Sequence, residues 1–118
     1  MLDAGAGTGF FARLLAGMAP PERDVRVTGL DSDPALIHAA SKLAAQAGLE
    51  GRVRSVAGDA CRLPFPDGGF DLVASHTLLG VLSQPLRAIR EQVRVARVGG
   101  MVAALESIPG LPEEGFFS

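Results

Sequence analysis

An acidic residue and three glycines lie together at the start of the chain, in the stretch LDAGAGTG. Asp3 is followed by Gly5, Gly7 and Gly9. Glycines let the backbone turn sharply and let a ligand lie against it without meeting a Cβ atom. A helix that follows such a loop presents unbonded N–H groups at its first turn. The pattern predicts a ligand-binding loop between a strand and a helix, with a loop that serves packing alone as the alternative.

The spacing of these glycines narrows the kind of ligand. GAGTG has glycine at every second position, whereas the dinucleotide fingerprint needs a glycine at position 10, which is Phe10. The phosphate loop of nucleotide hydrolases needs Gly-Lys followed by Ser or Thr, and this stretch has none. The sequence therefore favours a cofactor other than a dinucleotide, with a nicotinamide-dependent oxidoreductase as the less favoured alternative.

Two further acidic residues follow later apolar runs. Asp31 lies 22 residues after Gly9 (position 31 against position 9), close to the spacing at which a carboxylate binds ribose hydroxyls. Asp33 is explained as a helix cap, so ribose binding is assigned to Asp31 alone. Asp59 and Ala60 follow the next apolar run. There a carboxylate and a backbone amide can bind an adenine edge, with a turn-stabilising aspartate as the alternative.

The elements that must position these residues alternate along the chain. We expect strands at 1–3, 25–31, 52–59, 70–75 and 99–106, and helices at 9–18, 32–49 and 84–97. Thr8 and Asp33 are the expected N-caps of the first two helices, and Leu86, Ile89 and Val93 are expected to face the core from the third. The alternation predicts an α/β fold, an open parallel sheet with helices on both faces. Ligands bind such sheets at the carboxyl ends of the strands, where the acidic residues above would meet.

Composition excludes several classes of function. The chain has 118 residues, 47% hydrophobic, and a net charge of −2, which suits one small folded domain. Nucleic-acid binding is not expected, because the arginines are scattered, although a helical stripe of them at positions 87, 90, 94 and 97 could bind an acidic partner. Cys61 alone makes neither an internal disulfide nor a zinc site, so no metal is expected. We see no signal peptide and no apolar run of membrane-spanning length, and expect a cytoplasmic location.

Four stretches taken together resemble a known family. In order and spacing they are similar to class I S-adenosylmethionine-dependent methyltransferases, in particular the small-molecule subgroup that includes quinone-biosynthesis enzymes. The four stretches are LDAGAGTG, VTGLDSDP, VAGDACRLPFPDGGFDLV and REQVRVARVGG. The resemblance implies a Rossmann-like sheet of strand order 3-2-1-4-5, S-adenosylmethionine as cofactor and a small-molecule methyl acceptor. Residues 1–106 would form the methyltransferase core, and residues 107–118 a loop-like tail.

The resemblance also implies a role for each residue of the predicted site. Asp3 and the backbone of the glycine loop would hold the methionine part of the cofactor, Asp31 the ribose, and Asp59 with Ala60 the adenine. Ser75 and His76, at the end of the fourth strand, would lie beside the methionine part and the acceptor. The expected cofactor contacts are Asp3, Gly5, Ala6, Gly7, Gly9, Asp31, Ser32, Asp59, Ala60 and Ser75.

The sequence departs from the family pattern in two places and in length. Val98 replaces the proline usual before the Gly-Gly pair, and Gly80–Val81 replaces a frequent histidine pair. The family also has a helical region before the first strand and a sixth and seventh strand after the fifth, for which 118 residues leave no room. The fifth strand would then have an edge of unpaired backbone groups. Such an edge should be covered by the tail, paired with another subunit or prone to aggregation, and we predict self-association into a homo-oligomer.

Methyl transfer from a sulfonium is an in-line displacement, in which the protein mainly aligns donor and acceptor and excludes water. A general base is needed only where the acceptor must lose a proton. His76 is the candidate base, with a histidine that merely hydrogen-bonds in its loop as the alternative. For the whole chain, the second alternative is a noncatalytic domain that binds the cofactor or a partner.

Overall fold

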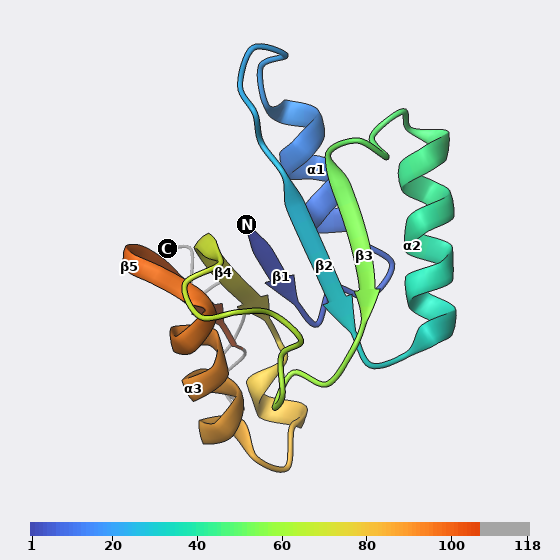
Figure 1. Ribbon diagram of the computed structural model, residues 1–118. Coiled ribbons are helices and arrows are strands. Elements are labelled where there is room, and N and C mark those ends of the chain that lie inside the picture. Colours follow the sequence, from blue (N-terminus) through green and yellow to red (C-terminus); the bar gives the residue numbers. More distant parts are fainter. Residues whose placement is uncertain (107–118) are drawn as a thin grey trace, which may run out of the picture.

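A computed structural model describes residues 1–106 (Figure 1). In these residues, five parallel strands form one sheet in the order β3-β2-β1-β4-β5. The strands are β1 (Leu2–Ala4), β2 (Val27–Asp31), β3 (Val53–Ala57), β4 (Phe70–His76) and β5 (Ala96–Leu105). The helices are α1 (Phe10–Met18), α2 (Pro34–Gln46), α3 (Pro85–Val95) and the short 3₁₀ helix η1 (Leu79–Val81). The predicted Rossmann-like order is confirmed, and the predicted tail, 107–118, lies outside the described residues.

Two apolar layers hold the helices against opposite faces of the sheet. The layer under α1 and α2 contains Ala12, Ala16, Val27, Ala44 and Val53. The layer under α3 and the loop after β3 contains Leu2, Leu30, Ala60, Leu63, Val73 and Val95. Successive side chains of a strand point to opposite faces, which is why Val27 and Leu30 of β2 belong to different layers. The prediction of helices on both faces is confirmed.

The starts of α1 and α2 follow from local sequence. A carboxylate oxygen of Asp33 accepts a hydrogen bond from Ala35 N at 2.9 Å, with Pro34 in the first turn of α2, as predicted. The predicted cap of α1 is wrong, because its N-cap is Gly9, with φ +80°, and not Thr8. Glycine adopts this left-handed conformation without strain, and the loop needs it to turn from β1 into the helix.

The third helix is rotated away from the orientation that its apolar stripe predicts. Leu86, Ile89 and Val93 are exposed, whereas Ala88 and Val95 are buried against the sheet. An alanine at the contact lets the helix approach the strands closely. Charged side chains of the same helix bind the loop after β3, as described below, and this bonding is satisfied only in the observed rotation. The predicted inward face of this helix is therefore wrong.

The fifth strand begins at Ala96, directly after α3 and three residues before its predicted start at position 99. Ala96 pairs with Phe70 and Met101 with Leu72, so four residues of β5 (97 to 100) lie opposite one residue of β4. This bulge shifts the register of the two strands. Within residues 1–106, β5 pairs with β4 alone, so its other edge is open. None of the helices in this range is long and apolar enough to cross a membrane.

Candidate functional site

The carboxyl ends of β1, β2 and β3 meet at one edge of the sheet (Figure 1). A hollow of about 130 Å³ lies there. Its lining is Gly5, Leu30, Asp31, Ser32, Gly58, Asp59, Ala60, Leu78 and Leu82. Five of the predicted cofactor contacts, from three separate loops, are thus brought together around one cavity.

The N–H groups of the glycine loop are already donated within the protein. Gly5 N and Ala6 N both donate to the carbonyl oxygen of Leu30, at 2.8 and 2.9 Å. Gly7 N donates to Oδ2 of Asp31 at 2.9 Å. A loop that cradles phosphate offers such groups to its ligand, whereas here they tie the loop to β2. What the loop offers a ligand is open surface, because a Cβ added at Gly7 would meet nothing within 4 Å.

The other two glycines of the loop are constrained by packing. Gly5 has φ +76°, and a Cβ added there would lie 3.0 Å from Cδ1 of Leu78. Leu78 therefore packs directly over the loop. Gly9 is buried at the start of α1 and does not line the hollow. Gly9 therefore serves the turn into α1 and does not contact the cavity.

Asp31 is bonded to backbone through both carboxylate oxygens. Oδ2 accepts from Gly7 N, and Oδ1 accepts from Asp33 N at 3.0 Å. A carboxylate has about four acceptor positions, so capacity remains for the two hydroxyls of a ribose. The two backbone bonds fix the carboxylate at the wall of the hollow.

The aspartate after β3 makes a turn bond. Oδ1 of Asp59 accepts from Cys61 N at 2.8 Å, and its carbonyl oxygen accepts from Arg62 N at 3.0 Å. This turn is the alternative role that the sequence left open, and it is present. Asp59 and Ala60 also line the hollow, so the turn presents both of them to the cavity.

Asp3 is a buried carboxyl group in the central strand. It is 4% exposed and lies between Gly29 of β2 and Ala74 of β4. Burial raises the pKa of Asp3 from 3.8 to about 6, an effect that the charge of His76 opposes and that of Asp31 reinforces. Ionisation of Asp3 thus costs more here than in water, and a positive charge placed beside the carboxylate would offset that cost.

The two predicted residues at the end of β4 lie on different faces of the sheet. Ala74 is the register partner of Asp3, and side chains alternate along a strand, so His76 shares the face of Asp3. His76 is exposed, and its charge acts on the Asp3 carboxyl group. Ser75 is the partner of Ala4 and shares the α3 face; it is 4% exposed, and its Oγ has no hydrogen-bond partner in the described part of the chain. Ser75 is not among the residues that line the hollow.

Sequence reasoning missed the segment between β4 and α3. Leu78 and Leu82 form one wall of the hollow. Glu106 holds this segment, since Oε2 accepts from Leu78 N at 3.1 Å and Oε1 accepts from Gly80 N at 2.8 Å. Leucines in an irregular stretch gave a weak signal for a cavity wall. A carboxylate that accepts from two backbone N–H groups 26 and 28 residues earlier in the chain leaves no signal in the sequence.

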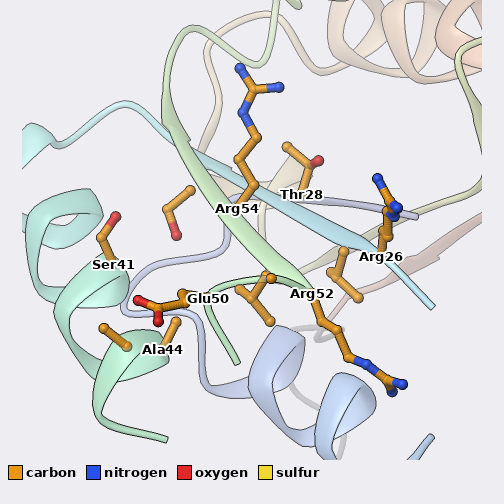
Figure 2. A pocket seen from close by; sticks show the side chains of 12 residues that line it. Arg26, Thr28, Ser41, Ala44, Glu50, Arg52 and Arg54 are labelled. Carbon is orange, nitrogen blue, oxygen red and sulfur yellow. The ribbon is translucent and has the colours of Figure 1, made fainter. Parts of the chain in front are cut away.

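A larger hollow, of about 630 Å³, lies beside α2 at the amino ends of β2 and β3 (Figure 2). Arg26, Arg52 and Arg54 contribute to it, but their side chains point in different directions. Arg26 pairs with Asp24 at 3.0 Å, and Arg52 donates to the carbonyl oxygen of Pro21. The arginines do not converge, and no predicted site residue lies here, so the smaller hollow is the candidate site. Across residues 1–106, no cluster of His, Cys, Asp or Glu is placed to hold a metal ion.

The sheet order, the glycine loop and the carboxylates of Asp31 and Asp59 at the carboxyl ends of β2 and β3 define a Rossmann-like domain of the kind that binds nucleoside cofactors. A family model described as a methyltransferase domain matches residues 2–104. The chain belongs to this methyltransferase family.

Curated relatives match most of this chain and a smaller share of their own length. Ajmaline N-methyltransferase of Rauvolfia serpentina is 37% identical over 108 residues, which are 92% of this chain and 36% of the relative. Demethylmenaquinone methyltransferase of Roseiflexus castenholzii is 42% identical over 106 residues, 89% of this chain and 41% of the relative. Among six such relatives the chain spans between 36% and 50% of the relative's length.

Solved structures share the fold over nearly the whole chain. The [4+2]-cyclase SpnF superposes with a TM-score of 0.83 at 34% identity, covering 97% of this chain and 42% of SpnF. A SAM-dependent methyltransferase from Aquifex aeolicus gives a TM-score of 0.77 at 26% identity, covering 96% of this chain and 61% of that one. Since one of the two is named a cyclase, the fold by itself does not define the reaction.

Proposed function

We propose that this chain binds S-adenosylmethionine at the carboxyl edge of the sheet and transfers its methyl group to a small molecule. The observation that carries the proposal is the polarity of the site. The loop's donors at Gly5, Ala6 and Gly7 are committed to the protein, and the surrounding side chains at Asp3, Asp31 and the position after β3 are acidic. Such a site disfavours a pyrophosphate and favours a ligand with a ribose and positive charge. S-adenosylmethionine has a ribose, a sulfonium and an ammonium, and no phosphate.

When bound, S-adenosylmethionine supplies an activated methyl group on a positively charged sulfur. We assign Asp3 to the ammonium of its methionine part, because a cation beside this buried carboxylate offsets the unfavourable burial of its charge. We assign Asp31 to the ribose hydroxyls, and Asp59 with Ala60 to the adenine, because all three line one hollow. Leu78 and Leu82 would exclude water from the opposite wall.

We propose His76 as the residue that accepts a proton from the methyl acceptor, where the acceptor must lose one. It is exposed and on the same face as Asp3, so it is open to a second substrate. The relatives are named for different acceptors, one as ajmaline N-methyltransferase and another as demethylmenaquinone methyltransferase. The shared part of the proposal is therefore a small-molecule acceptor.

Calorimetric titration with S-adenosylmethionine and with NAD tests the proposal. We expect the first to bind and the second not to. Asp31→Ala should weaken the binding of S-adenosylmethionine about ten-fold or more, because a site built to hydrogen-bond a hydroxyl loses its acceptor. Asp33→Ala is the matched control, since Asp33 caps α2, and should leave the dissociation constant within about two-fold. Binding of NAD without S-adenosylmethionine would contradict the proposal.

A second candidate function is binding of the cofactor without methyl transfer. Its support is the 34% identity to a protein named a cyclase. The two functions differ in turnover. Consumption of S-adenosylmethionine with any small nucleophile supports the transferase, whereas binding with no consumption across a panel of phenols, amines and quinols supports the second candidate.

We also propose that the open edge of β5 pairs with a second copy of the chain. Val98, Met101 and Leu105 of this strand are 99%, 63% and 64% exposed, and an apolar edge with unpaired backbone groups promotes association. Light scattering at micromolar concentration should give a mass above that of the monomer. Val102→Lys should restore the monomer mass, because a charge on an edge strand opposes pairing. A monodisperse monomer of the unmodified chain would contradict this proposal.

A further inference from the structure

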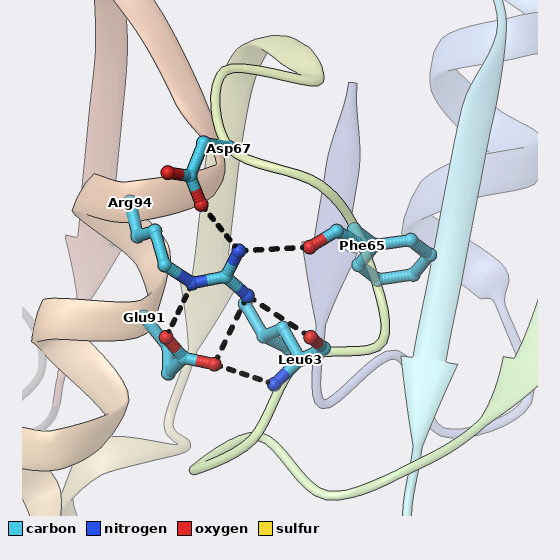
Figure 3. Close-up of polar contacts among 5 residues, drawn as sticks. All are labelled: Leu63, Phe65, Asp67, Glu91 and Arg94. Carbon is cyan, nitrogen blue, oxygen red and sulfur yellow. Dashed lines mark hydrogen bonds and ion pairs between the residues drawn. The ribbon is translucent and has the colours of Figure 1, made fainter.

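The guanidinium group of Arg94 forms a two-point contact with a carboxylate on its own helix. Nε donates to Oε2 of Glu91 at 2.7 Å, and Nη2 donates to Oε1 at 3.1 Å (Figure 3). Both residues lie on α3, three positions apart. The hydrogen bond from Arg94 lowers the pKa of Glu91, so the pair stays ionised at neutral pH. Such a fork is geometrically specific, because the planar guanidinium matches the two carboxylate oxygens.

The same guanidinium also holds the loop that follows β3. Nη2 donates to the carbonyl oxygen of Leu63 at 3.0 Å, and Nη1 donates to the carbonyl oxygen of Phe65 at 2.9 Å and to Oδ1 of Asp67 at 2.8 Å. Oε1 of Glu91 accepts from Leu63 N at 2.9 Å. The backbone of Leu63 is therefore bonded on both sides by the Arg94–Glu91 pair, as Figure 3 shows.

This loop carries the adenine side of the candidate site. Its other end is held to β2, because Gly58 N donates to the carbonyl oxygen of Asp31 at 3.0 Å. Only Asp59, Ala60, Cys61 and Arg62 lie between Gly58 and the bonded Leu63. Leu63 is 4% exposed, and it packs in the same apolar layer as Ala60. Any movement of Leu63 is thus transmitted over a short, bonded stretch to the two residues that line the hollow.

The four arginines at positions 87, 90, 94 and 97, which the sequence offered as a helical stripe, do not share one helix surface in the structure. Arg94 is turned to the loop, and Arg97 lies in β5, where its Nε donates to Oδ1 of Asp71 at 2.6 Å. Asp71 is 81% exposed and lies on β4, and the Arg97 side chain bonds Asp71 and the carbonyl oxygen of Val98, with no hydrogen bond to the loop after β3 among the described residues. Of these two arginine side chains, only that of Arg94 forms hydrogen bonds with the loop after β3.

We propose that Arg94 and Glu91 are positioning residues, which fix the loop of Asp59 and Ala60 and so set the ability of the site to distinguish adenine from other bases. This rests on the proposed function, because it takes the hollow to be the adenine side of a cofactor site. Neither side chain lines the hollow. Their effect is on the geometry of the residues that do.

The test is the preference for adenine, measured by titrating S-adenosylhomocysteine and S-inosylhomocysteine, which differ at the 6-position of the base. Arg94→Lys keeps the positive charge but loses the planar guanidinium, which makes the two-point contact with Glu91 and also bonds the loop carbonyl oxygens. We expect this variant to bind S-adenosylhomocysteine about ten-fold more weakly and S-inosylhomocysteine at most about three-fold more weakly, so that the preference falls. Arg97→Lys is the matched control and should change both dissociation constants by less than about two-fold.

The outcomes separate this inference from the function on which it rests. If the unmodified chain binds neither compound, the proposed function has failed. If it prefers the adenine compound and folded Arg94→Lys keeps the whole preference, the inference is overturned, because a merely structural role changes the melting temperature and not the ratio. Should Arg94→Lys not fold, Glu91→Gln retains an oxygen for Leu63 N and is judged by the same ratio.

Discussion

Replacing Asp3 with asparagine should stabilise the protein and weaken its proposed binding of S-adenosylmethionine. The pKa of the Asp3 carboxyl group is raised from 3.8 to about 6 because the group is buried. At about 1.4 kcal/mol per unit of pKa, this corresponds to about 3 kcal/mol against the folded, ionised state. Since a buried charge relaxes partly toward water, we expect Asp3→Asn to raise the free energy of unfolding by about 1 to 2 kcal/mol at pH 7.5.

The pH dependence of this gain identifies its cause. The folded protein binds the Asp3 proton more tightly than the unfolded chain does. The stability that this proton contributes is full below about pH 4 and is lost as the pH rises through about 6. The difference in unfolding free energy between Asp3→Asn and the unmodified chain should therefore grow over that interval and level off near pH 7.

Urea unfolding of both proteins at about pH 4.5, 6 and 7.5 measures the difference directly. Taking a difference at each pH cancels the titration of groups that the two proteins share, apart from those coupled to Asp3 such as His76. Asp31→Asn is the matched control, because it removes a neighbouring negative charge and leaves the buried Asp3 carboxyl group in place. A difference that is independent of pH, or an asparagine variant that is less stable at pH 7.5, would refute the reasoning from burial.

Three further results are expected. The affinity for S-adenosylhomocysteine should be about ten-fold weaker at pH 5 than at pH 7.5, because a carboxyl group of pKa about 6 is then mostly protonated, and calorimetry on Asp3→Asn should show no such change. Gly5→Ala should destabilise the protein by about 1 to 3 kcal/mol and weaken binding, since the φ of Gly5 is positive and the new Cβ would crowd Leu78. Gly48→Ala is the control, because Gly48 has φ +71° and open space around it. This control should lower the melting temperature and leave binding unchanged. Glu106→Gln should speed amide exchange at Gly80 about ten-fold, because the bonds to that segment are weakened; unchanged exchange would show that the segment is held by packing.

The parts of the fold that local patterns encode were predictable from the sequence. The alternation of apolar runs gave the sheet and its layers, and Asp33 with Pro34 gave the start of α2, because caps and turns depend on a few neighbouring residues. The meeting of Asp31 and Asp59 at one hollow was predictable, since carboxyl ends of parallel strands share one edge.

Features that depend on long-range packing were not predictable. The stripe of Leu86, Ile89 and Val93 indicated one rotation of α3, but Arg94 bonds a loop some 30 residues away and selects another. The face of Ser75 depends on its register with Ala4, which pairs positions far apart in the sequence. Periodicity carries information about neighbours along the chain and none about these partners.

The order in which the sheet forms depends on its short central strand, β1, because this strand pairs with both halves of the sheet. β1 has three residues, and Leu2 pairs with Thr28 on one side and with Val73 on the other, 26 and 71 positions away. The pairings of β1 with β2, of β2 with β3 and of β4 with β5 each join residues 26 to 29 positions apart, so these pairs can form early. β1 alone pairs with both halves, and the entropy of closing the longer loop delays its second pairing. Of the five strands described, β1 would therefore be the last to be enclosed on both sides, and loss of its pairing would divide the sheet in two.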